Sequence, residues 1–365
     1  MGLVTSETGL AASARILGDG LNSLVDALRR RGFGVVAPVV SDSVITLAIV
    51  ESADEIPSGW SDTQQPGHYR AEAGDGPLRF GHAAPAQPWK RYLHEPRTLL
   101  VRSRIDGSGD ARAAAAQPEP LAFVGIQSCD LAAIARLDAV LERDEAYHRR
   151  REGLFIVAVA CTSPASTCFC ASAGTGPMPG DGADIVLGEL DDGTLLATAH
   201  SARGAELLDA AGATEAASRA RVALVGQMVD DCAAAQTRAL DQHAIDAAAA
   251  TPDHPGWADV AARCLTCGNC TFQCPTCFCT STDDVTPLDG ESVERWQRWD
   301  SCFSLDFSYI HGGPVRPGAT SRYRQWYLHK LVTWHDQFGE SGCVGCGRCI
   351  TWCPTGIDIT EAVIT

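Results

Sequence analysis

Two cysteine runs with the same spacing are the residues of this chain best suited to chemistry. Each run reads C-x2-C-x2-C-x3-C-P, the arrangement that ferredoxins with two [4Fe-4S] clusters use. The first run consists of Cys264, Cys267, Cys270 and Cys274, and the second of Cys343, Cys346, Cys349 and Cys353. In such proteins the first three cysteines hold one cluster and the fourth reaches the other, so neither run is complete alone.

The spacing therefore predicts two ligand sets that cross between the runs. Cys264, Cys267, Cys270 and Cys353 would hold one [4Fe-4S] cluster, and Cys343, Cys346, Cys349 and Cys274 the other. A zinc site fits poorly, because zinc proteins usually separate two cysteine pairs by a longer gap. Each run here places four cysteines close together and ends at a proline, Pro275 or Pro354.

Four cysteines of the N-terminal part are candidates for a third cluster. Cys129 and Cys161 each follow a predicted strand, and Cys168 and Cys170 lie a few residues further on. If the two strands are parallel neighbours, their carboxyl ends meet at one sheet edge, where α/β proteins place ligands. The four thiols would then suffice for a third [4Fe-4S] cluster. The alternative is that they are buried, unreactive cysteines.

The sequence assigns no role to the other four cysteines, which are Cys232, Cys277, Cys279 and Cys302. The tetrapeptide Thr-Cys-Phe-Cys occurs twice, at 167–170 and at 276–279. The second copy and Cys302 could pack beside the clusters, or ligate a further cluster completed by Cys232 or a histidine. Only three of these thiols are expected within reach of one another, which favours a packing role.

The segments that would position these cysteines predict an α/β part followed by a mostly helical one. Residues 131–149 have the apolar spacing of a helix between two strands, and 205–250 is rich in alanine, the best helix former. Apolar, β-branched runs predict strands at residues 43–50, 98–101, 121–126, 154–160, 185–187 and 194–198. Residues 320–338 predict a helix with one apolar and aromatic face, which Gly339 would end.

The predicted fold class is therefore α+β, with a domain boundary near residue 250. A Thr-Pro-Asp-His-Pro-Gly segment of loop composition follows the alanine-rich stretch there. Residues 1–250 would form an N-terminal α/β domain, which could hold its own [4Fe-4S] cluster. Residues 251–365 would form a helical ferredoxin-type domain with both cysteine runs.

Composition excludes several classes of function. The 365 residues include 45 acidic against 29 basic side chains, a net charge of −16, and an acidic chain is a poor partner for nucleic acid. No apolar run approaches the ~18 residues of a membrane helix, and the N-terminus lacks the basic and apolar pattern of a leader. The 16 cysteines are typical of metal ligands in a reducing compartment, so a cytoplasmic location is expected.

No nucleotide-binding motif is complete in this sequence. Gly18-Asp-Gly20 and Gly174-Thr-Gly176 are not continued to G-x-G-x-x-G, and no G-x-x-x-x-G-K-[ST] motif occurs. Clusters move single electrons, so another component must supply the two-electron step. Six lysine and arginine residues between 295 and 335 could raise a cluster's reduction potential, dock an acidic partner or form a solvated helix face.

Beyond the cysteines, several segments resemble one family, the iron–sulfur (beta) subunits of cytosolic NiFe hydrogenases of the sulfhydrogenase type. This family also includes the iron–sulfur electron-transfer subunit of anaerobic sulfite reductase. The segments are residues 127–134, 161–177, 298–303, 307–313 and 321–326, and the likeness extends over 101–358. The resemblance implies a protein that passes electrons between a flavin-containing diaphorase subunit, which uses NADH or NADPH, and a catalytic subunit.

We therefore expect a cytoplasmic electron-relay subunit with two [4Fe-4S] clusters and a third in its N-terminal domain. Its partners would be a flavin/NAD(P)H diaphorase subunit and the small and large subunits of a NiFe hydrogenase. One alternative is the electron-transfer subunit of an anaerobic sulfite reductase complex, which shares these motifs. Another is a free-standing enzyme that acts on a small molecule at Cys129 or Cys161.

Overall fold

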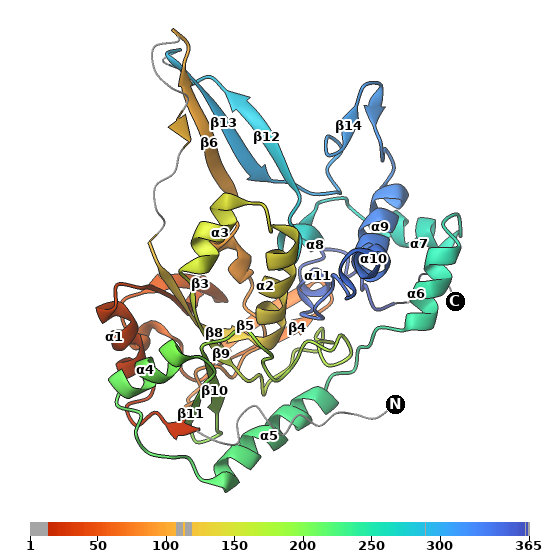
Figure 1. The fold of residues 1–365 in the computed structure, drawn as a ribbon. Coiled ribbons are helices and arrows are strands. Elements are labelled where there is room, and N and C mark those ends of the chain that lie inside the picture. Colours follow the sequence, from red (N-terminus) through yellow and green to blue (C-terminus); the bar gives the residue numbers. More distant parts are fainter. Residues whose placement is uncertain (1–13, 107–111, 114–118, 289, 362, 364–365) are drawn as a thin grey trace.

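A seven-stranded sheet forms the centre of the computed structural model, which describes residues 14–106, 112–113, 119–288, 290–361 and 363 (Figure 1). Its strands are β1 (Arg15–Ile16), β2 (Gly34–Ser41), β3 (Val44–Val50), β8 (Leu121–Gln127), β9 (Phe155–Val159), β10 (Ile185–Glu189) and β11 (Leu195–Ala199). The strand order is β1-β11-β10-β9-β8-β2-β3. The four strands β2, β8, β9 and β10 are parallel neighbours, and the others pair antiparallel at the two sides.

Helices cover both faces of this sheet, which explains why its central strands are apolar throughout. The sequence Phe-Ile-Val-Ala-Val of β9 is buried at every position, as expected of a parallel strand packed on both sides. On one face lie α1 (Asn22–Arg30) and α4 (Ala202–Ala210). On the other lie α2 (Ser128–Val140) and α3 (Glu145–Glu152).

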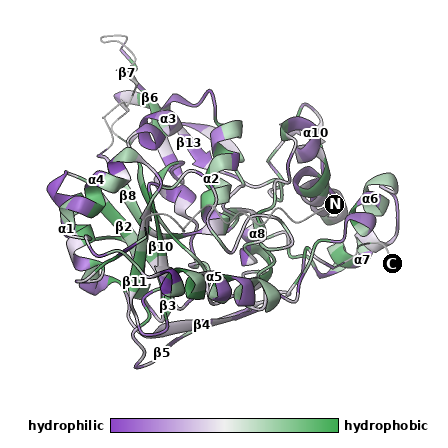
Figure 2. Cartoon of the chain, turned by 60° about the horizontal axis from the view of Figure 1, so that its bottom comes forward, coloured by the Kyte–Doolittle hydropathy of each residue, from purple (hydrophilic) through white to green (hydrophobic). Residues whose placement is uncertain are grey.

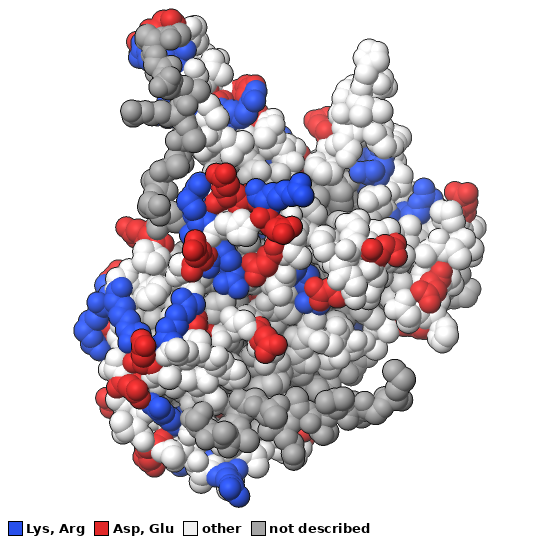
Figure 3. All heavy atoms as spheres, in the orientation of Figure 1, with Lys and Arg blue, Asp and Glu red and all other residues white. Residues whose placement is uncertain are grey.

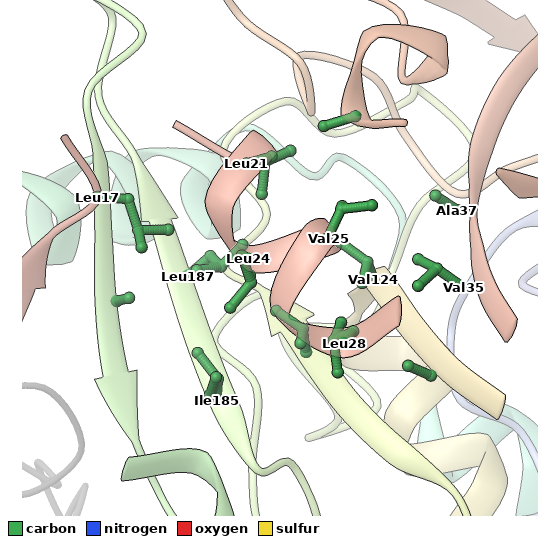
Figure 4. Packing of buried hydrophobic residues seen from close by; sticks show 14 of the residues in the cluster. Leu17, Leu21, Leu24, Val25, Leu28, Val35, Ala37, Val124, Ile185 and Leu187 are labelled. Carbon is green, nitrogen blue, oxygen red and sulfur yellow. The ribbon is translucent and has the colours of Figure 1, made fainter. Parts of the chain in front are cut away.

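The core under α1 illustrates how the sequence builds this layer. Leu24, Val25 and Leu28 are fully buried and lie on one side of the helix, because residues three and four apart share a helical face. In Figure 4 they lie over the strands that carry Val124 and Leu187. Figure 2 shows the same pattern across the domain, with hydrophobic strands inside and more hydrophilic helix surfaces outside.

A second sheet joins the N-terminal part of the chain to the segment between the cysteine runs. It consists of β6 (Arg97–Arg104), β7 (Arg112–Ala113), β12 (Thr280–Val285) and β13 (Ser292–Trp299), in the order β12-β13-β6-β7. This sheet projects from the body of the molecule (Figure 1). Two further hairpins are β4 (Trp60–Gln65) with β5 (His68–Ala73), and β14 (Tyr309–Ile310) with β15 (Gly313–Pro314).

Most of the remaining elements are helices of the second half of the chain. They are α5 (Arg219–Ala234), α6 (Gln242–Ala250), α7 (Gly256–Arg263), α8 (Asn269–Phe272), α9 (Ala319–Leu328), a π-helical turn (His329–Thr333), α10 (Trp334–Phe338) and α11 (Arg348–Thr351). Short 3-10 helices lie at Ala53–Glu55 and Trp89–Tyr92. The segment from α9 to α10 confirms the helix predicted for 320–338, and Gly339 ends it in the left-handed conformation, with φ of +74°.

The α+β fold class is confirmed, with three differences of detail. The predicted strand at 98–101 belongs to β6 and therefore to the second sheet. The helix predicted over 131–149 is divided into α2 and α3, because the Asp144 carboxylate caps α3 by accepting hydrogen bonds from two backbone N–H groups, each at 3.0 Å. The C-terminal part contains β12 and β13 in addition to its helices. The boundary at residue 250 stays a prediction.

Charged side chains of both signs are mixed on the surface around α3 (Figure 3). Arg151 pairs with Asp138 at 3.0 Å, and Arg150 with Glu95 at 2.6 Å. Acidic side chains therefore neutralise Arg150 and Arg151 on this face.

Within the described ranges, no helix is both long and apolar enough to cross a membrane.

Candidate iron–sulfur sites

The two cysteine runs have the same local structure. In each run a glycine in the left-handed conformation follows the second cysteine and starts a four-residue helix. Gly268, with φ of +78°, precedes α8, and Gly347, with φ of +75°, precedes α11. The two short helices pack against each other. The runs are therefore neighbours in space although they are far apart in the sequence, which is what a crossed ligand set requires.

The first cavity brings together the three leading cysteines of the first run and the last cysteine of the second. Its lining includes Cys264, Cys267, Cys270, Cys349 and Cys353. The other walls are mostly apolar and include Leu265, Phe303, Tyr323, Trp326 and Ile357. Burial raises the pKa of the Cys270 thiol, and the neighbouring thiols of Cys264 and Cys353 raise it further. The structure thus places Cys353 beside the three leading cysteines of the first run.

The second group of thiols has the reciprocal composition. Burial raises the pKa of Cys349, and the nearby thiols of Cys343, Cys346 and Cys274 raise it further. Cys274 itself behaves differently, because a hydrogen bond with Cys277 holds its pKa well below the ordinary value. The structure therefore places the last cysteine of the first run with the leading cysteines of the second.

The third cavity lies at the edge of the central sheet. Cys129 is in the first turn of α2, directly after β8, and Cys161 follows β9. Since β8 and β9 are parallel neighbours, both thiols reach one edge of the sheet, as predicted from the sequence. The cavity is lined by Cys129, Cys161, Cys168 and Cys170, together with Cys346. The amide of Gln236 donates a hydrogen bond to the Cys170 sulfur at 3.3 Å.

The three groups form a continuous series. Cys349 belongs to the second group but also lines the first cavity, and Cys346 belongs to the second group but also lines the third. The contact between the second and third groups is close: the Phe169 N–H donates to the Gly345 carbonyl at 2.9 Å, and a Cβ at Gly345 would lie 2.6 Å from the Cys170 backbone. Glycine is therefore needed at position 345.

A buried ion pair fixes the second run to the N-terminal part. Both amino groups of the Arg348 guanidinium donate to the Asp130 carboxylate, at 2.9 and 2.7 Å, and the Arg348 Nε donates to the Pro85 carbonyl at 2.7 Å. The side chains are 0% and 1% exposed. Each partner is next to a candidate ligand in the sequence, Arg348 to Cys349 and Asp130 to Cys129. Sequence reasoning missed this pair, because adjacency alone does not show that the two residues meet.

We expect Asp130→Asn to destabilise the protein by about 3–5 kcal/mol, because it leaves the Arg348 charge buried without a counter-charge. Anaerobic urea denaturation, followed by tryptophan fluorescence, measures this loss. Asp284→Asn is the matched control, since Asp284 pairs with Arg295 at 2.7 Å at the surface and its loss should change stability little. Equal stability of Asp130→Asn and the unchanged protein would contradict a structural role for the pair.

The four cysteines without a predicted role all lie beside another thiol. Cys232 is hydrogen-bonded to Cys161, and this bond raises the pKa of the Cys161 thiol. Cys277 is hydrogen-bonded to Cys274 in the same way. A hydrogen bond with Cys302 lowers the pKa of Cys279 to about 7. All sixteen cysteines carry free thiols, so no disulfide accounts for their number.

In the part of the chain that the structure describes, no three His, Cys, Asp or Glu side chains converge where they could hold a single metal ion. A [4Fe-4S] cluster distributes its four irons over separate thiolates. The thiol-lined cavities therefore support cluster binding, and the assignment of each ligand stays a prediction.

Comparison with known proteins agrees with this geometry. Residues 263–357 match the model of the 4Fe-4S dicluster domain, a range that includes both cysteine runs. The fold and its paired cysteine runs thus define a 4Fe-4S dicluster protein.

The chain is also 31% identical over 283 residues to sulfhydrogenase 2 subunit beta of Pyrococcus furiosus, with 74% of this chain and 80% of that protein covered. It belongs to the sulfhydrogenase beta-subunit family. It is an iron–sulfur electron-transfer subunit of the hydrogenase type. No solved structure matches the chain significantly.

Proposed function

We propose that this chain relays electrons between a flavin/NAD(P)H diaphorase subunit and the small and large subunits of a NiFe hydrogenase, in the cytoplasm. The observation that carries the proposal is the series of three adjoining thiol groups. Electron transfer through a protein needs redox centres that lie close together. In the second group of thiols, Cys349 also lines the first cavity and Cys346 also lines the third. The relative from Pyrococcus furiosus, a sulfhydrogenase subunit, favours hydrogenase over sulfite reductase as the partner.

The proposed ligand sets follow the groups described above. Cys264, Cys267, Cys270 and Cys353 hold the first [4Fe-4S] cluster. Cys343, Cys346, Cys349 and Cys274 hold the second. Cys129, Cys161, Cys168 and Cys170 hold the third, within the N-terminal domain of residues 1–250. The first two clusters belong to the domain of residues 251–365.

The residues around these thiols suit them to this task. When bound, each [4Fe-4S] cluster takes up and releases one electron. Around the first site, the backbone N–H groups of Thr266 and Ile357 donate to the sulfurs of Cys264 and Cys353 at 3.4 and 3.3 Å. Hydrogen bonds to cluster sulfurs and the burial of the site are the means by which a protein sets the reduction potential. Cys267 is exposed, so the first site is the one best placed for exchange with a partner at the surface.

Anaerobic purification of the native complex through a tag on this chain tests the proposal. We expect a flavin-containing chain that accepts electrons from NADH or NADPH, and a nickel-containing pair of chains, to purify with it. This chain should contribute at least about eight iron and eight acid-labile sulfide atoms, because each cluster has four of each.

Two results would contradict the proposal. A sirohaem protein in place of the nickel-containing pair would assign the chain to a sulfite reductase. A chain that purifies alone and converts a small molecule by itself would show a free-standing enzyme, with Cys129 or Cys161 as the first residues to test.

A further inference from the structure

A fourth group of thiols lies outside the three sites described above. Cys277, Cys279 and Cys302 line one cavity of about 210 Å³, together with His329 and Lys330. The pairing of β12 with β13 brings two of the thiols together, because Cys279 immediately precedes β12 and Cys302 closely follows β13. The Asp300 N–H, two residues before Cys302, donates to the Cys279 carbonyl at 2.8 Å. The cavity therefore depends on the hairpin between the cysteine runs.

This cavity resembles the third site, because each is lined by the two cysteines of one Thr-Cys-Phe-Cys segment. The third site uses the copy at 167–170, and this cavity uses the copy at 276–279. In both copies the two cysteines line a cavity, and each copy is hydrogen-bonded to a residue in the second cysteine run or directly before it. Phe169 of the first copy donates its N–H to Gly345, and Thr276 of the second donates its hydroxyl to the Gly342 carbonyl at 2.7 Å. The second run thus lies between two similar pairs of thiols.

The polar groups around the cavity are donors in need of acceptors. The indole N–H groups of Trp326 and Trp334 are buried without a hydrogen-bond partner, although both side chains line the cavity. Lys330 is 3% exposed, and its amino group donates to the Thr276 hydroxyl at 2.8 Å and the Gly342 carbonyl at 3.5 Å and is also hydrogen-bonded to the Cys274 thiol. Among the described residues, no carboxylate forms an ion pair with Lys330. Because buried donors and charges need partners, the cavity suits an anionic ligand.

The three thiols and the His329 imidazole indicate which kind of anion the cavity would bind. The His329 ring lies 5.4 Å from the Trp334 ring and 6.2 Å from the Phe278 ring, between their centroids. Neither of its ring nitrogens has a hydrogen bond within the described part of the chain. Three thiolates and one imidazole make four ligands, the number that a cubane needs, and histidine can replace cysteine on an iron of a cluster. A cluster bound by three thiolates is also an anion.

We propose that this cavity holds a further iron–sulfur cluster, with Cys277, Cys279, Cys302 and His329 as its four ligands. It goes beyond the relay proposed above and does not depend on it. The site adjoins the second cluster, because Cys277 is hydrogen-bonded to Cys274. It therefore forms a branch from the middle of the series, and Lys330 supplies the counter-charge for the bound cluster.

Iron analysis of the anaerobically reconstituted full-length chain tests the ligands. We expect the double variant Cys279→Ser/Cys302→Ser to lose about four iron per chain, one cubane, while keeping the signals of the other clusters. Cys168→Ser is the reciprocal variant, since it should lose the third cluster and keep this one. An unchanged iron content in the double variant would overturn the proposal. The proposal would then be wrong even if a small anion were found to bind in the cavity.

Pulsed EPR of the unaltered, reduced protein tests the histidine without relying on a variant that must fold. A nitrogen hyperfine coupling that changes when the histidines are labelled with 15N is expected on one cluster. His329→Cys should remove this coupling and retain the iron, because a thiolate replaces the imidazole. His335→Gln, at an exposed histidine of α10, should leave the coupling unchanged. Absence of a coupled histidine nitrogen in the unaltered protein would overturn the assignment of His329.

The experiments distinguish a missing third cluster from a missing fourth one. If the third site holds no cluster, Cys168→Ser loses no iron, whereas the double variant still does. If the fourth site holds no cluster, the reverse is observed.

Discussion

Cys353→Ala is expected to remove the signal of the cluster held by the first run, although Cys353 lies four residues after Cys349 in the second. The reason is that Cys353 lines the cavity of Cys264, Cys267 and Cys270. With one of its four thiolates absent, this cluster should be lost or converted to a three-iron form, at a cost of about one to four iron per chain. Iron analysis and EPR of the anaerobically purified chain measure the loss.

Thr355→Ala is a suitable control for this experiment. The Thr355 hydroxyl lies 3.5 Å from the Cys353 sulfur, so the variant alters the surroundings of this thiol without removing it. Its iron content should be unchanged. Loss of only the cluster that Cys343, Cys346 and Cys349 hold, with the first cluster intact, would refute the crossed assignment.

Cys168→Ser is expected to remove about four iron, one cubane, and to leave the signals of both dicluster-domain clusters near their original intensity. The expectation follows from the third cavity, where four of the five lining thiols come from the N-terminal part and the fifth, Cys346, is assigned to the second cluster. Because this site can be completed without a thiol of the other domain, it should be lost independently. Electron transfer from the flavin partner to the catalytic subunit should also fall if this cluster lies on the route.

Cys232→Ala separates a ligand from a neighbour in the same region. Cys232 is hydrogen-bonded to Cys161 but does not line the third cavity. Its removal should therefore retain the iron. A full iron content in Cys168→Ser would mean that the N-terminal thiols hold no cluster.

Local patterns in the sequence were enough to predict much of this architecture. Strands that are buried on both faces appear as continuous apolar runs, so β8, β9, β10 and β11 were predictable, and β3 was predictable from its β-branched and apolar residues although one of its faces is partly exposed. The position of Cys129 and Cys161 after two such strands predicted that they would meet at one sheet edge, and the structure places them there. The spacing within each cysteine run predicted that its first three thiols would be neighbours, because the chain between them is short, and the ligand sets themselves stay predictions.

Contacts between distant segments were not predictable from local pattern. The pairing of β6 with β13 joins a strand that lies between β3 and β8 in the sequence to one that lies between the two cysteine runs, and the residues of neither strand indicate this partner. The fourth cavity depends on the β12–β13 hairpin, so its thiols looked too few and too scattered to form a site. Lys330 and Arg322 had seemed compatible with one solvated basic face, but both are buried. The residue type alone does not show whether a lysine or arginine side chain is buried or exposed.

The most direct test of the relay is EPR of the native complex exposed first to hydrogen and then to oxidised nicotinamide cofactor. The Cys353→Ala and Cys168→Ser variants identify which signals belong to this chain. We predict that hydrogen reduces these clusters and that NAD⁺ or NADP⁺ reoxidises them. Clusters that stay oxidised under hydrogen, while the complex still reduces the nicotinamide, would contradict the relay.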